Sequence, residues 1–299
     1  MAFKQSAGEK IFERLNHIIL LIFGLSTVYP FVYIITLSFN DGLDALKGGI
    51  YLWPRVFTLD NYIKCFQNEL IFNSYMITVF RTIVGTFLAT LLCSMLAFAL
   101  TKKKLPGRSA ILFFFFFTTI FSGGLIPYYI LLRQLNLTNS IWVYVIPQLY
   151  SFYNVIILKT YFETIPKSIS ESAVIDGCSD VQIFSKIYLP LSGPVIATIL
   201  LFFGVAHWND WFTGTYFVQD KRLFPAATML QNLLTESTYE SSTFDTTKMN
   251  TSLAMSGVTT TPESLKMAFI VIMTLPIVFV YPFLQKYFIK GVMIGAIKG

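Results

Sequence analysis

Six long runs of apolar residues dominate this sequence and limit the folds open to it. They fall at about residues 17–39, 74–100, 110–132, 141–160, 194–217 and 265–285. A helix needs about 20 apolar residues to cross the hydrocarbon core of a bilayer. Charged residues make up only 13% of the chain, whereas a soluble domain carries about 25%. The sequence therefore excludes a soluble enzyme, a disordered tail and a disulfide scaffold. It predicts an all-α membrane protein with about six transmembrane helices.

Several kinds of functional site are excluded by the residues that the chain contains. The three cysteines lie in different kinds of segment, and an odd number gives no disulfide framework. The only histidines are His17 and His207, which excludes HExxH and multi-histidine zinc sites, so we expect no metal site. No GxxxxGK[ST] motif occurs, so we do not expect the chain to bind nucleotide through a P-loop. The net charge of +6 comes from loops between apolar runs and does not indicate nucleic acid.

Lysine and arginine positions predict how the spans are oriented. The segments 1–16, 101–109, 159–193 and 286–299 lie on one side and together hold 13 of these residues in 74. The segments on the other side hold seven in 89. Because cytoplasmic loops carry the excess of positive charge, both termini are expected inside. The first run is too long for a signal-peptide core, so we expect it to be retained as the first span.

This topology gives four expected divisions of the chain. They are a cytoplasmic N-tail (1–16), the first transmembrane helix with an external loop (17–73), a transmembrane domain (74–285) and a cytoplasmic C-tail (286–299). The other long external loop, 218–264, contains a Ser/Thr-rich tract at 237–261. It is interpreted either as a solvated loop or as a docking surface, with 224–229 as its most structured part.

A polar segment at 165–190 has the pattern of two short helices joined at a glycine. Gly177 is suited to a left-handed stop after the first helix. Each helix is expected to begin with a capping box, Ser168 with Glu171 and Ser179 with Gln182, and Pro190 is expected to end the second helix. Apolar residues recur at spacings of three and four along both helices, so each has one apolar side. Such a side requires a groove, either in its own bundle or on a partner.

The same segment resembles the EAA loop of ABC importer permeases. The matching residues are Glu171, Ser172, Ala173, Gly177, Ile187, Leu189 and Pro190, with Ser172 where alanine is usual. The stretch 207–211 (HWNDW) and the ending 282–295 are similar to carbohydrate-uptake permeases of the maltose type, in the subgroup for complex oligosaccharides. This resemblance covers nearly the whole chain and implies a type I ABC importer permease fold.

The resemblance implies a division of labour among several subunits. The EAA loop of the family is a coupling helix that contacts a cytoplasmic ATPase dimer. The residues expected to make this contact are Glu171, Ser172, Ala173, Asp176, Gly177, Ile187, Leu189 and Pro190. The other expected partners are a second permease, an external solute-binding protein and an oligosaccharide. ATP and magnesium are expected on the ATPase, with no cofactor on this chain. The C-tail at 290–299 is expected to reach between the ATPase subunits. The expected location is the bacterial inner membrane.

Polar groups inside spans indicate where a substrate could pass. Trp208, Asn209, Asp210 and Trp211 lie near the outer end of the fifth run and Arg81 lies in the second. Indole rings stack on sugars and polar side chains bind hydroxyls, which favours substrate contact. The alternatives are an interfacial tryptophan belt and a structural Asp210–Arg81 pair. Gly123, Gly124 and Pro127 are expected to kink the third span.

Two other functions remain open from the sequence. One is a permease for a non-sugar solute, which the HWNDW stretch and the C-terminal ending argue against. The other is a membrane enzyme that would use Asp210 and His207. No acid–base or nucleophile constellation supports catalysis, so no catalytic residue is expected. Neutral and uronic oligosaccharides both remain open as substrates.

Overall fold

Nearly all of the described structure is helical, which follows from long apolar runs with few breaking residues. The structure is a computed structural model that describes residues 7–243 and 260–296. Within those ranges the only strand-like pairing is one isolated bridge between Asn40 and Phe57. The chain divides into two compact units: residues 1–68 with 233–272, and residues 69–232 with 273–299. Parts of the expected N-tail, C-tail and Ser/Thr-rich tract, at 1–6, 244–259 and 297–299, lie outside the described residues.

Three helices in the described ranges are long and apolar enough to cross a membrane unbroken, and three bent helix pairs raise this number to six. The unbroken helices are α1 (Ala7–Ser38), α4 (Glu69–Thr101) and α15 (Pro262–Ala296). The bent pairs are α5 (Arg108–Ile120) with α6 (Leu125–Gln134), η1 (Ile141–Tyr144) and η2 (Ile146–Gln148) with α7 (Phe152–Phe162), and the segment Asp180–Leu191 with α11 (Gly193–Asn209). The all-α fold class with about six spans is therefore confirmed.

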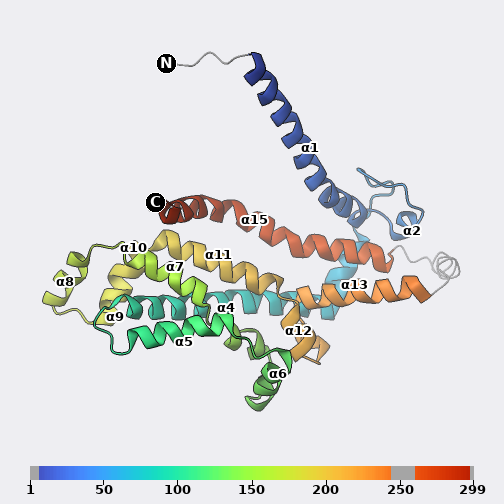
Figure 1. The fold of residues 1–299 in the computed structure, drawn as a ribbon. Helices are drawn as coiled ribbons and strands as arrows, with labels where there is room; N and C mark the ends of the chain where they lie inside the picture. The colour runs from blue at the N-terminus through green and yellow to red at the C-terminus, as the bar shows by residue number, and fades with distance from the viewer. Residues whose placement is uncertain (1–6, 244–259, 297–299) are drawn as a thin grey trace. The chain divides into compact units, whose positions relative to one another are not determined.

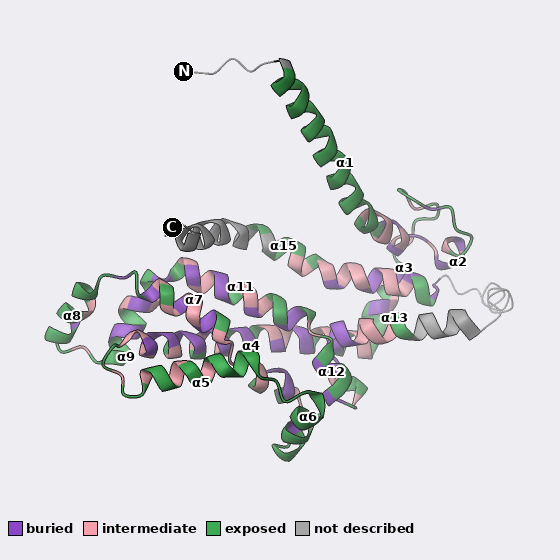
Figure 2. Cartoon of the chain, viewed as in Figure 1, coloured by how far each residue is buried: buried purple, intermediate pink, exposed green. Residues whose placement is uncertain are grey.

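The second unit is built around α4, which packs along α7 and α11 (Figure 1). Small residues recur every four positions on one face of α4, at Gly85, Ala89, Cys93 and Ala97, and all four are buried. Small side chains let helix backbones approach closely, which is how helices associate in membranes without a hydrophobic driving force. Buried positions follow α4, α7 and α11, whereas α5 is exposed along most of its length (Figure 2).

Three spans depart from the expected continuous helices. The fourth breaks between η2 and α7, with a bend of 47°. The third is broken, with α5 and α6 bent by 118°. The expected kink lies at 121–124, where Gly124 has φ +87°, a conformation that non-glycine residues rarely adopt. The fifth ends at Asn209 instead of 217, and a separate short helix, α12 (Phe212–Phe217), follows. There the Asp210 carboxylate accepts a hydrogen bond from the Thr213 backbone N–H at 3.1 Å, so α12 begins afresh.

The region after α12 is partly interior. It contains η4 (Lys221–Leu223) and α13 (Ala226–Thr243). Phe224, Ala226 and Thr228 are buried, and the Ala226 backbone N–H donates to the Thr78 hydroxyl at 2.8 Å. The stretch 224–229 is therefore held in unit 2 by α4, which leaves little of it exposed.

The first unit contains α1 and two short helices, α2 (Gly42–Ala45) and α3 (Asp60–Gln67). Asn61 is fully buried, and its amide donates to the backbone oxygens of Ser38 and Asn40 at 3.0 and 2.9 Å. Its side-chain oxygen accepts from the Ser264 hydroxyl at 2.8 Å. These bonds tie the start of α15 to the end of α1, although 200 residues separate them in sequence.

Candidate functional site

The segment 165–190 forms an elbow at one end of unit 2. Its first helix is α8 (Lys167–Ile175), and its second begins with α9 (Asp180–Ile183). Gly177 between them has φ +78°. The backbone N–H of Cys178 donates to Ala173 at 2.9 Å and that of Gly177 to Val174 at 3.1 Å. These two bonds make a Schellman motif, which satisfies the last carbonyls of α8. The predicted left-handed stop at Gly177 is confirmed.

One of the two predicted capping boxes is present. The Ser179 hydroxyl accepts from the Gln182 N–H and the Gln182 side chain accepts from the Ser179 N–H, so the second helix begins as predicted. The box at Ser168 is wrong, because α8 begins two residues earlier than a cap at Ser168 requires, with Pro166 as N-cap and no side-chain cap bond. Proline has no backbone N–H and a φ close to the helical value, so it fits the start of a helix.

The expected helix end at Pro190 is confirmed to within one residue, because the helix ends at Leu191. The second helix continues from α9 through a π-turn, η3 (Phe184–Tyr188), and α10 (Leu189–Leu191) before it bends by 86° into α11. A π-turn shifts the backbone bonding by one residue, so the helix accommodates the missing N–H of Pro190. Pro190 itself is exposed, whereas Ile187 and Leu189 pack against the core.

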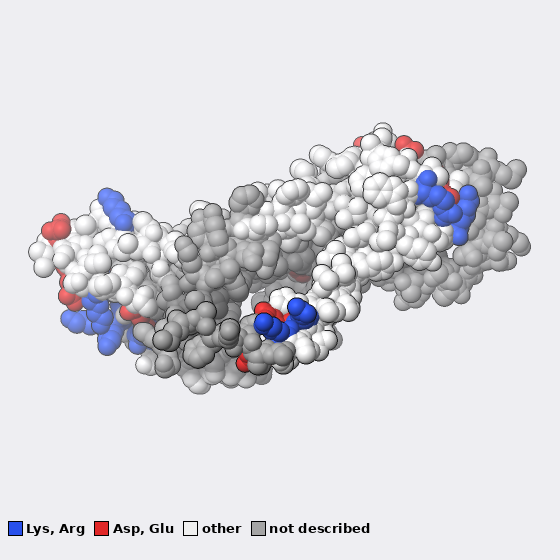
Figure 3. Space-filling model, turned by 90° about the horizontal axis from the view of Figure 1, so that it is seen from above, with Lys and Arg blue, Asp and Glu red and all other residues white. Residues whose placement is uncertain are grey.

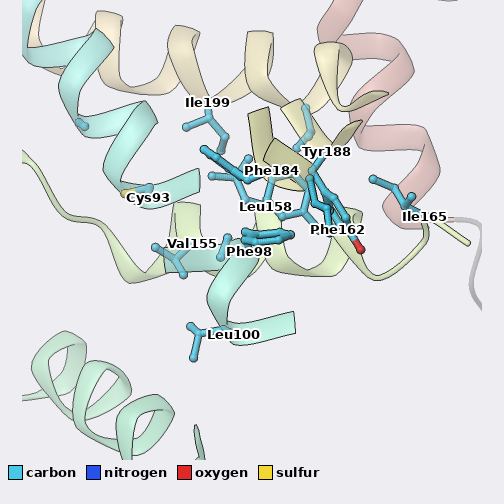
Figure 4. Packing of buried hydrophobic residues seen from close by; sticks show 14 of the residues in the cluster. Cys93, Phe98, Leu100, Val155, Leu158, Phe162, Ile165, Phe184, Tyr188 and Ile199 are labelled. Atoms are coloured by element: carbon cyan, nitrogen blue, oxygen red, sulfur yellow. The ribbon is translucent and has the colours of Figure 1, made fainter. Parts of the chain in front are cut away.

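One side of the elbow is fixed to the helical bundle. Ala173, Ile183 and Phe184 are buried in the core that α4, α7 and α11 form. The Phe98 ring lies 5.5 Å from Phe184 and 4.8 Å from Tyr188, centroid to centroid. Figure 4 shows these three side chains within the buried cluster. The elbow therefore packs directly against three spans.

The other side of the elbow has no partner among the described residues. Ile175 is 86% exposed, Val181 74% and Val174 58%. Glu171, Ser172, Asp176 and Gly177 are exposed as well. An exposed apolar patch rimmed by polar residues is typical of a protein interaction site. Thus Ala173 packs inward on the bundle, whereas the other central residues of the EAA match face outward.

Lys102 of the 101–109 loop contacts the elbow, and the sequence did not predict this contact. The Lys102 ammonium lies 2.9 Å from Asp180 and 4.8 Å from the Phe98 ring centroid. Both side chains of the Lys102–Asp180 ion pair are substantially exposed. The ion pair therefore contributes little to the stability of the fold, and its main effect is on the orientation of α9. Figure 3 shows charged side chains gathered at the end of unit 2 that carries α8 and α9. The positive charge of 101–109 predicts the orientation of this loop, but not its contact with α9.

The candidate substrate residues are divided between interior and surface. Arg81 is fully buried, and its guanidinium donates to the Asp210 carboxylate at 3.4 Å and to the Asp210 carbonyl at 2.6 Å. The Gln148 amide donates to the same carboxylate at 3.1 Å. The Tyr144 ring lies 5.3 Å from the guanidinium. The structural pairing of Arg81 with Asp210 is confirmed, and it holds the start of α12 against α4.

Trp208 and His207 also point into the interior. The Trp208 indole N–H donates to the Met273 carbonyl at 3.1 Å, and this tryptophan is only 8% exposed. The His207 ring packs on Gly85, where an added Cβ would lie 2.6 Å from it. Asn209 and Trp211 are exposed. Of the HWNDW stretch, these two residues are therefore available to a substrate, and the other three shape the packing.

The chain is similar to known membrane transport proteins. The profile of the family described as "Binding-protein-dependent transport system inner membrane component" matches residues 82–294. The polygalacturonan/rhamnogalacturonan transport system permease protein YtcP of Bacillus subtilis (strain 168) is 38% identical over 290 residues, covering 97% of this chain and 99% of that protein. Protein LplC of the same organism is 36% identical, covering 97% and 96%.

A solved structure has the same fold. It is described as the crystal structure of a bacterial ABC transporter involved in the import of the acidic polysaccharide alginate. One of its chains matches with a TM-score of 0.86 and 29% identity, covering 96% of this chain and 100% of that one. The type I permease fold and the family resemblance are confirmed, and the membrane-enzyme alternative is not supported. This chain belongs to the family of binding-protein-dependent transport system inner membrane components, and it is a permease subunit of an ABC transporter, not an enzyme.

Proposed function

We propose that this permease imports an oligosaccharide that an external solute-binding protein delivers. The observation that carries the transport mechanism is the elbow, which is fixed on one side and leaves Ile175 and Val181 exposed on the other. The substrate class is supported by relatives whose names describe polygalacturonan, rhamnogalacturonan and arabinooligosaccharides. The similarity to the alginate importer chain supports the same class.

The proposed orientation places the elbow in the cytoplasm. The excess of lysine and arginine on the side of 1–16, 101–109, 159–193 and 286–299 supports this orientation, with both termini inside. The corresponding divisions are the N-tail at 1–16, the first span and external loop at 17–73, the transmembrane domain at 74–285 and the C-tail at 286–299. The external side then carries α12, η4 and α13.

The elbow is the proposed contact with an ATPase dimer. Glu171, Ser172, Asp176 and Gly177 would face the ATPase together with the exposed aliphatic side chains. The remaining motif residues would connect this contact to α11. They are Ala173, Ile187, Leu189 and Pro190. ATP and magnesium would bind the ATPase, and this chain would bind no cofactor. Closure of the ATPase dimer would then move the elbow and, through its buried side, α4, α7 and α11.

A second permease completes the proposed pathway, since one chain supplies only one wall. Residues 8–31 of α1 are exposed within the described structure, so their surface is available to lipid or to the second permease. Asn209 and Trp211 would contact the sugar, whereas Arg81, Trp208 and Asp210 would hold the helices that present them. The C-tail at 290–299 is proposed to reach toward the ATPase.

A co-purification experiment tests the mechanism. The tagged chain is extracted from its native membrane in detergent, and ATPase activity is measured in the eluate. Ile175→Asp and Gly177→Asp are expected to lose the co-purifying ATPase, because a charge would be placed in an apolar contact. The control is Ser109→Asp, which adds the same charge at an exposed position of the neighbouring loop. Equal ATPase recovery from all variants would contradict the proposed role of the elbow.

The substrate class is tested in proteoliposomes that hold the complete transporter. Uptake of an oligogalacturonide and of an arabinooligosaccharide is compared with uptake of a tripeptide of similar size. ATP-dependent uptake of either sugar is expected. Uptake of the peptide alone would overturn the sugar assignment and favour a non-sugar solute.

A further inference from the structure

A polar hollow lies between α6 and α12, away from the elbow and from the Arg81 cluster. Its volume is about 300 Å³, at the small end of the range for small-molecule sites. The lining side chains are Tyr129, Arg133, Thr138, Asn139, Tyr216, Phe217 and Gln219. A second hollow of about 210 Å³ is lined by Leu125, Ile126, Tyr129 and Tyr216. The two tyrosines therefore line both a polar and an apolar hollow.

The two tyrosine rings are held in place by neighbouring aromatic residues. The Tyr129 ring lies 6.2 Å from the Phe217 ring, with an angle of 23° between their planes. The Tyr216 ring lies 4.4 Å from the Phe212 ring. Tyr216 is 46% exposed, so its ring remains accessible from the hollow. Rigid, amphipathic tyrosine rings give contact area at little entropic cost, and their faces suit the apolar face of a sugar ring.

The polar wall of the hollow is fixed by Asn139. This residue has a left-handed φ of +56°, which asparagine tolerates better than most residues. Its side-chain oxygen accepts from the backbone N–H groups of Gln219 and Asp220 at 3.1 and 2.9 Å. Its own backbone N–H donates to the Phe217 carbonyl at 2.9 Å. The loop after α12 is thereby tied to the loop after α6, and the hollow is held open.

The charge in the hollow is positive and available. Arg133 lies in the last turn of α6 and, among the residues that the structure describes, its guanidinium has no carboxylate partner. Asp220, in the loop that Asn139 binds, has its carboxylate engaged by Arg222 through contacts of 2.9 and 3.1 Å. A favourable helix dipole explains a cation at the end of α6. It does not explain why the cation lines a hollow together with two tyrosines.

We propose that this hollow is a subsite for one acidic sugar residue of the transported oligosaccharide. The Tyr129 and Tyr216 rings contact the sugar ring, and the Arg133 guanidinium binds the uronate carboxylate. Arginine binds carboxylates in a planar, two-bond geometry. The inference rests on the proposed sugar import and on the external position of the α6 and α12 ends. It narrows the substrate class from oligosaccharides in general to those that contain uronic acid.

The test uses the complete transporter in proteoliposomes with a saturating amount of its binding protein. The probes are trigalacturonate and its fully methyl-esterified form, which differ in charge. Arg133→Gln is expected to reduce the ratio of acidic to esterified uptake by about tenfold, the effect of losing one charge-assisted contact. Every variant is assayed with the same binding protein. Any preference of the binding protein for one of the two probes is therefore the same for all variants and does not affect their comparison. Arg133→Lys is expected to recover part of the ratio.

Two further variants keep the test specific. Lys221→Gln removes the same charge from an exposed neighbouring position outside the hollow, and it is expected to leave the ratio unchanged. Tyr216→Ala is expected to slow uptake of both probes. An unchanged ratio for Arg133→Gln, or equal loss of both probes together with weaker docking of the binding protein, would overturn the subsite and leave sugar import standing. A wild-type transporter that imports neither probe, but imports a peptide, would overturn both.

Discussion

The buried pair of Arg81 and Asp210 gives the sharpest quantitative prediction. The Arg81 side chain is 0% exposed and that of Asp210 is 15% exposed, so solvent screens the pair weakly. Breaking a buried pair by removing one partner costs about 3–5 kcal/mol, because a charge is left without compensation. In Arg81→Leu the Asp210 carboxylate keeps its bonds from Gln148 and Thr213 at 3.1 Å each. We therefore expect Arg81→Leu to lower the free energy of unfolding by about 3 kcal/mol, the lower end of that range.

The complementary variant and the double variant separate the charge pair from packing. Asp210→Asn retains the shape and the bond from the Thr213 N–H, but it leaves the Arg81 charge buried without an anion. We expect it to cost about 2–4 kcal/mol. The double variant removes both charges. Its loss of unfolding free energy is therefore expected to be about 2 kcal/mol smaller than the sum of the losses in the two single variants, a coupling typical of contacting residues.

The assay is reversible unfolding of the purified chain in mixed detergent micelles, followed by tryptophan fluorescence. The control cycle uses Lys102→Leu and Asp180→Asn. Their ion pair is shorter, at 2.9 Å, but its side chains are 37% and 71% exposed, so the expected coupling is below about 1 kcal/mol. A coupling for Lys102 and Asp180 as large as that for Arg81 and Asp210 would refute the reasoning that burial, not distance, sets the strength here.

Three other substitutions or modifications have clear expected outcomes. Gly177→Val should lower ATP-driven uptake more than Gly177→Asn, since φ is +78° there and asparagine tolerates that region; equal uptake would show that the turn is unimportant. Gly85→Ala should destabilise the protein by about 1–3 kcal/mol in the same unfolding assay, because the new Cβ would lie 2.6 Å from the His207 ring; wild-type stability would contradict that packing. Burial raises the pKa of the Cys65 thiol to about 11, so at pH 8 only about 0.1% is thiolate, the reactive form. N-ethylmaleimide should therefore label the partly exposed Cys178 much faster than Cys65, with mass spectrometry as the readout, and added ATPase should protect Cys178; comparable labelling rates would contradict the burial of Cys65.

The sequence predicted features that depend on neighbouring residues. The Gly177 turn and the Ser179 capping box follow from residues within five positions of each other, and both are present. The spans follow from apolar runs, because a bilayer requires a minimum helix length whatever the tertiary packing. The capping box at Ser168 failed because two local start signals competed, and Pro166 begins α8 earlier. The helix end near Pro190 was predicted, but the π-turn before it is not visible in the residue pattern.

Features that depend on distant residues required the structure. The motif residue Ala173 and the exposed Ile175 lie two positions apart on α8, and one faces the core while the other does not. Residues two apart lie about 200° apart around a helix, so opposite faces are expected from the spacing. Which of the two faces the core depends on where α4 and α7 lie, and the spacing contains no such information. The hollow at Arg133 likewise joins the end of α6 to a loop about 80 residues later.

The sequence by itself determined the class of the protein, its approximate spans and the helix–glycine–helix pattern of 165–190, since bilayer thickness and backbone hydrogen bonding act locally along the chain. Only the tertiary structure decided which polar residues are buried. Arg81 and Asp210, 129 positions apart, become one buried pair, whereas Asn209 next to Asp210 remains exposed. The physical reason is that the cost of burying a charge depends on its partner, and helix packing, not sequence distance, brings that partner within reach.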